Sequence, residues 1–267
     1  MSIQTPETQP VVFIGHGSPM NLIEANPWTT EWERLGRELP RPRAILMISA
    51  HWYTRDNGVQ SDPQPAMIYD MYGFPPPIYE LQYPAATSPD LIARVQERLG
   101  SEVAAIANRG YDHGAYAPLL KMYPEADIPV VQLSSNAALD ARAWFALGQN
   151  LAPLRQEGIL IIGSGNIVHN LRQLNMAMSN RAYPECVAFD RAIASAVDPQ
   201  RGNDLAAALH WEELPGASLA AAYPDHLSPF YYTLGAAMGS GDALPAVEIL
   251  TQDYLMGTLS MTSYVWR

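Results

Sequence analysis

Five of the six histidines in this 267-residue chain stand where apolar segments end or in loops rich in glycine, proline and aspartate. They are His16, His51, His113, His169 and His226. Neutral imidazole is a common ligand of divalent zinc and iron, and histidine is also the side chain whose pKa best suits proton transfer near neutral pH. Five such side chains are more than a structural metal site needs. The sequence therefore indicates a metal centre in which some histidines transfer protons.

The spacing of these histidines shows that only the fold can bring them together. Neighbouring members of the five are 35 to 62 residues apart in the sequence. No His-x-x-x-His helix and no Cys-x-x-Cys ribbon occurs, so no short metal-binding motif is present. The sixth histidine, His210, lies at an ordinary helix end among charged residues, and we leave it out of the site.

Three apolar runs are expected to position three of the histidines. Residues 11–14, 44–48 and 159–162 are typical of buried strands, and each run is followed by small residues and then by His16, His51 or His169. In an open α/β sheet, the carboxyl ends of parallel strands meet at one edge, where ligands usually bind. We therefore expect these three histidines to share one site, with His113 and His226 supplied by loops that precede helices.

The remaining pattern predicts strands alternating with helices. Helices are expected over 26–39, 89–100, 114–123, 137–156, 184–197, 204–210 and 230–238, and further strands over 66–69, 128–133, 246–251 and 259–266. Residues 54–65 are typical of a polar turn, and the many prolines of 72–89 predict an ordered loop rather than a helix. The fold class is therefore α/β, a single catalytic domain over 1–267 with a mixed central sheet flanked by helices and the metal site at one sheet edge.

Composition limits the partners of the protein. The formal net charge of −11 argues against nucleic acid, which requires a positive surface. The single cysteine, Cys186, excludes an intrachain disulfide and is consistent with a reducing compartment. Residues 1–10 lack the pattern of a signal peptide, and no apolar run approaches the length of a membrane span. We expect a cytoplasmic protein that is a monomer or a small homo-oligomer, with no nucleic-acid or membrane partner.

The local contexts of the five histidines resemble a known family. The segments that carry the resemblance are Gly15-His16-Gly17-Ser18-Pro19-Met20, Ser49-Ala50-His51-Trp52, Asp112-His113-Gly114, Gly163-Ser164-Gly165-Asn166-Ile167-Val168-His169-Asn170 and Asp225-His226-Leu227-Ser228-Pro229. Together they look like the class III extradiol ring-cleaving dioxygenases, and in particular their 4,5-DOPA dioxygenase branch. The resemblance runs from Val11 to the C-terminus.

This resemblance implies a non-haem metal site, with iron(II) in the active enzyme and zinc(II) often present in purified protein. It implies that His16, His51 and His226 are metal ligands and that His169 is a fourth ligand or the acid/base. His113 matches a histidine that lies behind the ligands in the wider family, and we expect it to assist proton transfer. The wider family uses two histidines and one glutamate, whereas this chain has His226 where the glutamate is expected.

The implied reaction opens a catechol such as L-DOPA by 4,5-cleavage with O₂ to give a semialdehyde. Catechol must lose protons near neutral pH, and a histidine is the natural base. Three side chains, Ser18, Asn166 and Asn170, either orient imidazoles or serve as loop and helix caps.

The substrate-binding side is less defined in the sequence. Four aromatic residues, Tyr72, Phe74, Tyr79 and Tyr116, either pack against the substrate ring or belong to the core. If the substrate carries a carboxylate, Arg109 and Lys121 are the cations that we consider as its partners.

Two other functions stay open at the level of sequence. A zinc-dependent hydrolase or amidase needs a similar cluster, because a zinc site with one open position activates water. The absence of a His-Glu-x-x-His motif weakens that alternative, while Asp112 and Asp225 keep it open. A non-catalytic relative is the other alternative, and the retention of all five histidines argues against it.

Overall fold

A mixed eight-stranded sheet forms the centre of the molecule. The computed structural model describes residues 7–100 and 103–267. The strands lie in the order β4-β3-β5-β2-β6-β1-β10-β7. Their bounds are β1 (Val11–Gly15), β2 (Ala44–Thr54), β3 (Gly58–Gln60), β4 (Ala104–Ile106), β5 (Val130–Asn136), β6 (Ile159–Gly165), β7 (Val247–Leu250) and β10 (Ser263–Trp266).

The four strands in the middle of the sheet are parallel. Strand β2 pairs in parallel with β5 and β6, and β6 pairs in parallel with β1. Antiparallel pairs join β3 to β5 and β10 to both β1 and β7, so the sheet is mixed. The parallel pairs place the carboxyl ends of β1, β2 and β6 at one edge. This confirms the predicted α/β fold with a mixed central sheet.

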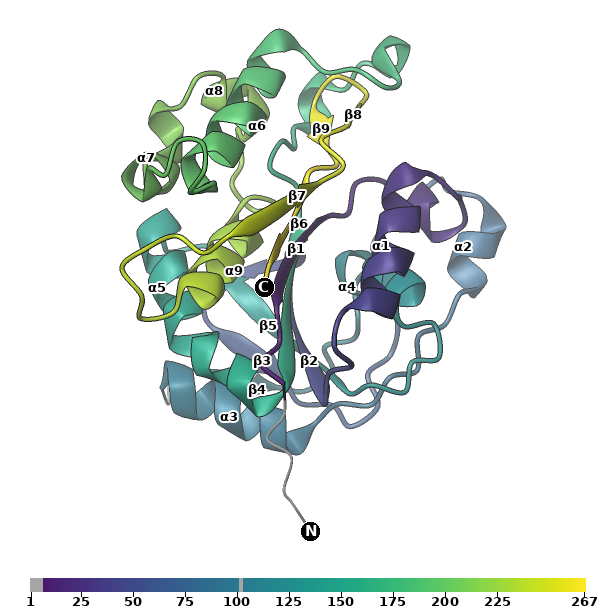
Figure 1. Cartoon of the computed structure of the whole chain (residues 1–267). Helices are drawn as coiled ribbons and strands as arrows, with labels where there is room; N and C mark the ends of the chain where they lie inside the picture. Colours follow the sequence, from purple (N-terminus) through teal and green to yellow (C-terminus); the bar gives the residue numbers. More distant parts are fainter. Residues whose placement is uncertain (1–6, 101–102) are drawn as a thin grey trace.

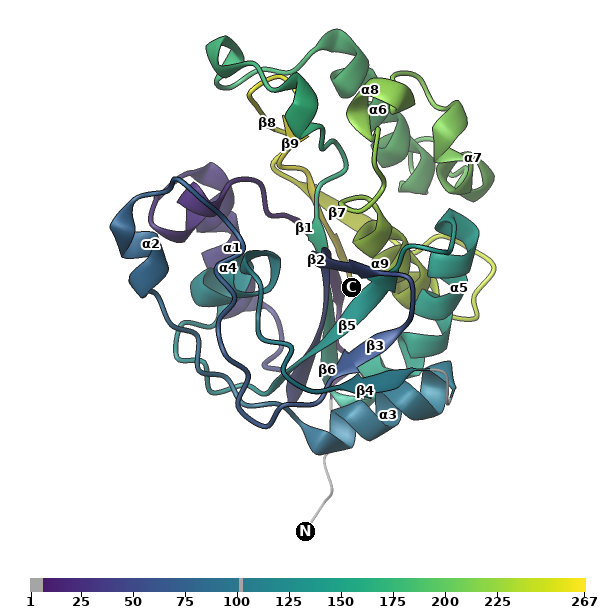
Figure 2. The same cartoon turned by 180° about the vertical axis from the view of Figure 1, so that it is seen from behind.

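Helices cover both faces of the sheet, as Figures 1 and 2 show from opposite sides. Side chains alternate along each strand, so in β1 Val12 and Ile14 join the core on one face while Val11 and Phe13 join the core on the other. The first face is covered by α1 (Pro27–Glu38) and α4 (His113–Met122), and the second by α3 (Pro89–Leu99), α5 (Ala141–Leu151) and α9 (Ser228–Met238). Both faces are therefore apolar, as buried parallel strands require.

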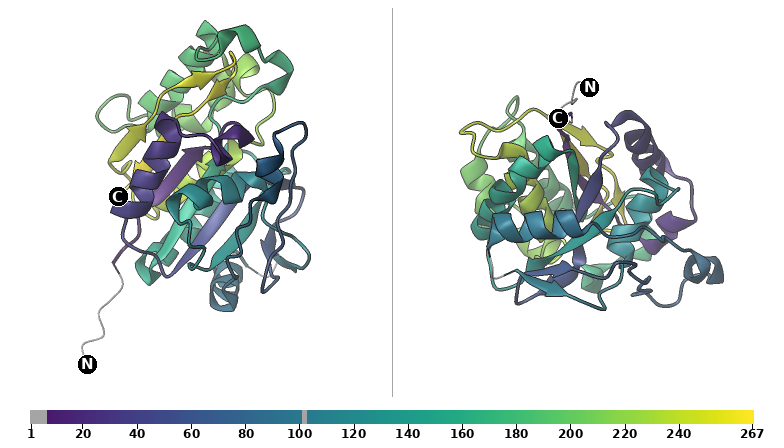
Figure 3. Two further views of the ribbon diagram at one scale, coloured as in Figure 1. Left: turned by 90° about the vertical axis from the view of Figure 1, so that its right-hand side faces the viewer. Right: turned by 90° about the horizontal axis from the view of Figure 1, so that it is seen from below.

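A second group of elements lies beyond the carboxyl ends of the strands. It contains α6 (Pro184–Val197), α7 (Leu205–Leu209), α8 (Ala217–Ala220) and the two-stranded sheet of β8 (Tyr254–Leu255) and β9 (Leu259–Ser260). Figure 3 shows this group, in green and yellow, above one end of the central sheet. It supplies one wall of the site described below.

The structure corrects several predicted elements in the first half of the chain. Residues 66–69 are not a strand, because only Met67 forms an isolated bridge, with Tyr111. The segment 54–65 contains the short strand β3, which lies between β4 and β5 and which its polar composition concealed. The proline-rich loop contains the short helix α2 (Pro76–Glu80), whose first two residues are proline. Proline is tolerated there because the first turn of a helix leaves its N–H groups unpaired anyway.

Two further predicted elements are divided in the structure. The helix expected over 137–156 begins only after Asp140, whose side chain caps α5, and ends in a 3₁₀ helix over Ala152–Glu157 that contains Pro153. The strand expected over 259–266 is split into β9 and β10, which belong to different sheets.

Residues 1–6 lie outside the described part of the chain, and so does most of the segment tested for a signal peptide. Among the described residues, no helix combines the length and apolar character that crossing a membrane requires.

Candidate metal centre

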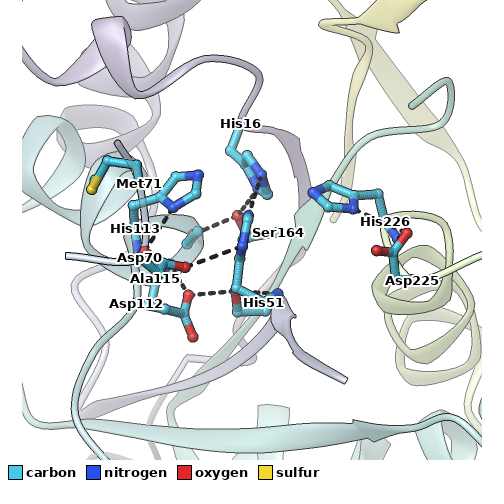
Figure 4. A network of polar contacts seen from close by, with 12 residues as sticks. His16, His51, Asp70, Met71, Asp112, His113, Ala115, Ser164, Asp225 and His226 are labelled. Atoms are coloured by element: carbon cyan, nitrogen blue, oxygen red, sulfur yellow. Dashed lines mark hydrogen bonds and ion pairs between the residues drawn. The ribbon is translucent and has the colours of Figure 1, made fainter. Parts of the chain in front are cut away.

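The structure brings all five histidines to the carboxyl edge of the sheet. His16 follows β1, His51 lies near the end of β2, and the chain leaving β6 carries His169. His113 is the first residue of α4, and His226 lies two residues before α9. All five line one cavity of about 340 Å³, a volume in the range of ligand pockets. Figure 4 shows His16 and His51 with His113 on one side and His226 on the other.

Ser164 determines the tautomer of His16. The Ser164 hydroxyl donates to the backbone carbonyl of Gly114 at 2.5 Å, so its oxygen accepts from His16 Nδ1 at 2.9 Å. His16 therefore carries its proton on Nδ1 and presents the lone pair of Nε2 to the cavity. Fixing the second ring nitrogen in this way is how proteins orient metal-binding histidines.

Asp70 acts in the same way on two histidines. Its carboxylate oxygens lie 3.1 Å from His51 Nδ1 and 2.8 Å from His113 Nδ1, so both nitrogens donate and both Nε2 atoms keep a lone pair. Burial raises the pKa of Asp70, but the bonds to His113 and His51 hold it well below the usual carboxyl value. Burial lowers the pKa of His51, and the Asp70 contact together with the charge of Asp112 raises it on balance.

The Nε2 atoms of His16 and His51 face each other at 3.2 Å. Two nitrogen lone pairs at this distance repel unless a proton or a metal ion lies between them. Two imidazoles on one zinc ion, with metal–nitrogen distances near 2.0–2.1 Å, would have their nitrogens about 3 Å apart. Donor atoms of His16, His51 and His113 all lie within 4.8 Å of one another, as do those of His169, Asp225 and His226. The facing nitrogens of His16 and His51 therefore fit a divalent metal ion.

His169 and His226 form a stacked pair. Their ring centroids are 3.4 Å apart and their planes differ by 6°. His226 Nδ1 is buried without a hydrogen bond, although Asp225 Oδ1 lies 3.1 Å away and accepts from the His226 backbone N–H at 2.8 Å. Burial and the neighbouring imidazoles lower the pKa of His169 and His226 well below the usual histidine value. Both rings are therefore neutral at neutral pH.

Asp112 anchors the strand and helix that carry His51 and His113. It is fully buried, accepts from Ser49 Oγ at 2.6 Å and caps α4 through Ala115 N at 3.1 Å. A Cβ at Gly114 would lie 2.4 Å from Ser49 Oγ, so glycine is required where α4 approaches β2. Asp112 therefore fixes the positions of His51 and His113 relative to each other.

The two cations considered for a substrate carboxylate lie elsewhere. The guanidinium of Arg109 pairs with Asp112 and lies over the ring of Trp52, 5.1 Å from its centroid. The ammonium of Lys121 is exposed and contacts the backbone oxygen of Glu24. Neither residue lines the metal cavity.

Of the two roles considered for the three polar residues Ser18, Asn166 and Asn170, the structure shows that of caps and loop anchors. Ser18 caps the 3₁₀ helix Pro19–Leu22, and Asn166 donates to the Ser260 carbonyl at 2.7 Å. Asn170 caps a 3₁₀ turn and donates to the Leu219 carbonyl at 2.8 Å. Sequence reasoning missed Asp70 and Ser164 as partners of the rings, although Ser164 stands in the glycine-rich segment before His169.

Aromatic and aliphatic side chains form the walls of the cavity. Tyr72 and Phe74 line it, whereas Tyr79 and Tyr116 do not. Tyr116 is fully buried in the core, and Tyr79 accepts from the Phe74 backbone N–H at 3.2 Å. The other apolar residues of the walls are Pro19, Met71, Leu171, Leu174, Met256 and Leu259.

A buried carboxylate supports the wall made by the C-terminal segment. Asp190 of α6 is fully buried and accepts from Tyr254 Oη at 2.9 Å, Ser260 Oγ at 3.2 Å and Thr262 Oγ1 at 2.9 Å. Among the described residues it forms no ion pair with a cation. Burial raises its pKa to about 6, against the effect of the three hydroxyls.

Replacing Asp190 by asparagine should change the pH dependence of stability. A raised carboxyl pKa means that the folded protein binds an extra proton between about pH 4 and pH 6, so this group's contribution to stability falls by about 3 kcal/mol as pH rises through that window. Asparagine cannot ionise. The free energy of unfolding of D190N, compared with that of the wild type, should therefore be higher at pH 7.5 than at pH 4. Urea unfolding of both proteins at the two pH values measures this difference. A difference in free energy of unfolding that does not vary with pH would contradict the raised pKa of Asp190.

Comparison with known proteins places this geometry in a family. Residues 11–266 match the family model described as the catalytic LigB subunit of aromatic ring-opening dioxygenase. The chain is 39% identical to 4,5-DOPA dioxygenase extradiol of Escherichia coli K12, covering 98% of this chain and 96% of that protein. It is 37% identical to the protein of the same name from Beta vulgaris, covering 94% of each.

A solved structure agrees with these sequence matches. The crystal structure of an uncharacterized protein from Escherichia coli K12 superposes with a TM-score of 0.81 at 36% identity, covering 97% of this chain and all of that chain. With five histidines at the carboxyl edge of the sheet and a family match across nearly the whole length, the chain belongs to the LigB family of aromatic ring-opening dioxygenases and is an extradiol ring-opening enzyme.

Proposed function

We propose that the enzyme opens the ring of a catechol such as L-DOPA by 4,5-cleavage with O₂, giving a semialdehyde, and that iron(II) is the active metal. The relatives named for 4,5-DOPA cleavage support the substrate class. The single observation that carries the proposal is the pair of imidazoles, His16 and His51, whose Nδ1 atoms are both hydrogen-bonded so that their Nε2 lone pairs, 3.2 Å apart, are left for a metal.

We assign His16, His51 and His226 as the metal ligands. Imidazole nitrogens suit iron(II) and zinc(II) alike, which is consistent with either metal occupying the site. When bound, a non-haem iron(II) ion supplies open positions at which the two catechol oxygens and O₂ meet. His113 lies beside the ligands, with its ring centroid 3.9 Å from that of His51.

His169 is the proposed acid/base. Because its ring is stacked parallel to that of His226, the lone pairs of the two rings cannot converge on one ion. A neutral imidazole beside the ligands can instead accept a proton from a catechol hydroxyl and later return it to the substrate as the ring opens. His113, held by Asp70, is the second group able to carry a proton.

The cavity walls suit a flat apolar ring. Tyr72 and Phe74 come from the segment before α2, whereas Leu174 and Met256 come from the elements beyond the strand ends. Aromatic and aliphatic side chains of this kind bury a catechol ring and exclude water from the reacting oxygens.

The test is turnover after anaerobic loading with iron(II) or, in parallel, with zinc(II). On adding L-DOPA and air, the iron-loaded enzyme should consume one O₂ per L-DOPA and form a yellow product that contains both oxygen atoms. The zinc-loaded enzyme should consume none. Equal activity of the two forms, or L-DOPA loss without O₂ uptake, would contradict the proposal and favour hydrolytic chemistry.

A further inference from the structure

The metal cavity offers no cation for a substrate that carries a carboxylate. Its lining, within the part of the chain that the structure describes, contains histidines, Asp70, Ser18 and aromatic and aliphatic side chains but no lysine or arginine. A carboxylate that leaves water without a partner loses its hydration at a large cost. The side chain of an acidic catechol must therefore reach outside this cavity.

A second cavity of about 300 Å³ adjoins the first. His169 and Leu171 line both, so the two cavities are neighbours beside the proposed acid/base. Arg172 is the cation of the second cavity, and Asp225 is its carboxylate. The exposed ring of Tyr223 forms another part of the wall.

The backbone beneath Arg172 is held firmly. Asn170 Oδ1 accepts from Arg172 N at 3.2 Å, and Asn170 Nδ2 donates to Leu219 O at 2.8 Å. Thr258 exchanges two hydrogen bonds with the Asn170 backbone, at 3.1 and 2.8 Å. The guanidinium of Arg172 is exposed, and it forms no ion pair with any residue of 7–100 or 103–267. The backbone of Arg172 is therefore held in place beside the site, and its guanidinium is available to an anion.

We propose that Arg172 binds the carboxylate of the substrate's side chain and so makes the enzyme selective for catechols that carry an acid group. This inference rests on the proposed function. Arginine suits the role because its planar guanidinium donates two parallel hydrogen bonds to a carboxylate. Asp225, in the same cavity, can accept from an ammonium group, so both charges of an amino acid such as L-DOPA find an opposite charge there.

The experiment compares matched catechols on the wild type and on Arg172→Gln. L-DOPA and dopamine differ only by the carboxylate, as do 3-(3,4-dihydroxyphenyl)propanoate and 4-ethylcatechol. Binding of each to zinc-loaded protein is measured by calorimetry, so the result does not depend on turnover. Where iron-loaded enzyme turns over, kcat and KM are measured as well.

The carboxylates should bind the variant about ten- to a hundredfold more weakly than the wild type, the range expected for a hydrogen-bonded charge. Dopamine and 4-ethylcatechol should bind both proteins equally, and Arg172→Lys should restore part of the loss. In turnover the change should appear in KM rather than in kcat. Arg181→Gln, which removes an exposed arginine outside both cavities, is the control and should change nothing.

Two results would overturn the inference. One is equal weakening of all four catechols, which would indicate a structural effect of the substitution. The other is unchanged binding of the carboxylates. By contrast, if the predicted pattern of binding is found but no catechol is ring-opened by iron-loaded wild type, the proposed function fails and the anion site stands.

Discussion

Alanine at His16 should abolish metal binding and, with it, ring opening. The Nε2 atom of His16 faces that of His51 at 3.2 Å, and its tautomer is fixed by Ser164. Losing a partner behind a metal ligand typically costs about 10–100-fold in metal affinity, so losing the ligand itself should cost more than about a hundredfold. Metal content after dialysis, together with O₂ uptake on L-DOPA, measures the effect.

Two variants serve as controls for His16→Ala. His210→Ala removes a histidine that contacts Arg142 on the surface and should retain full metal content. Ser164→Ala keeps His16 but loses the hydrogen bond that fixes the tautomer of His16. The metal affinity of Ser164→Ala should therefore lie between those of His16→Ala and His210→Ala. Full metal occupancy in His16→Ala would refute the assignment of this site.

Replacing His169 by alanine should lower kcat by about 10²–10⁴, the usual contribution of a general acid/base. Because the stacked ring is assigned no bond to the metal, the variant should keep its metal and bind catechol with near-normal affinity. Stopped-flow spectra of the anaerobic complex would show catechol binding, and steady-state O₂ uptake would show the loss of turnover. Added imidazole should restore part of the rate.

Other outcomes for His169→Ala have clear meanings. Loss of the metal would make His169 a ligand and would contradict the argument from ring stacking. A near-normal rate would leave His113 as the proton carrier. His210→Ala is again the matched histidine control.

The position of the site could be predicted because it depends on strong local signals. Buried parallel strands are runs of apolar residues, as in 11–14 and 159–162, and the position of a histidine at the end of each run follows from the topology of parallel sheets. The start of the helix after Ser88 was equally clear, because Ser88 caps it and Pro89 is its first residue.

The partners of the histidines could not be predicted because they are distant in the sequence. Ser164 and His16 are 148 positions apart, and Asp70 lies in an irregular segment 43 positions before His113. Nothing local distinguishes such a serine or aspartate from those that cap turns, and Ser18 does cap one. The same limit explains why β3, a strand of only three residues with polar neighbours in the sequence, was missed.

The most direct test of the central claim is the position of ring opening. In L-DOPA opened between C4 and C5, the aldehyde carbon is bonded to a carbon that carries hydrogen, so the aldehyde proton couples to it. In L-DOPA opened between C2 and C3, the aldehyde carbon is bonded to the carbon that carries the side chain, which has no hydrogen. A freshly formed product from iron-loaded enzyme should give a split aldehyde signal in its proton NMR spectrum. An unsplit aldehyde signal, or a product without an aldehyde, would contradict 4,5-cleavage.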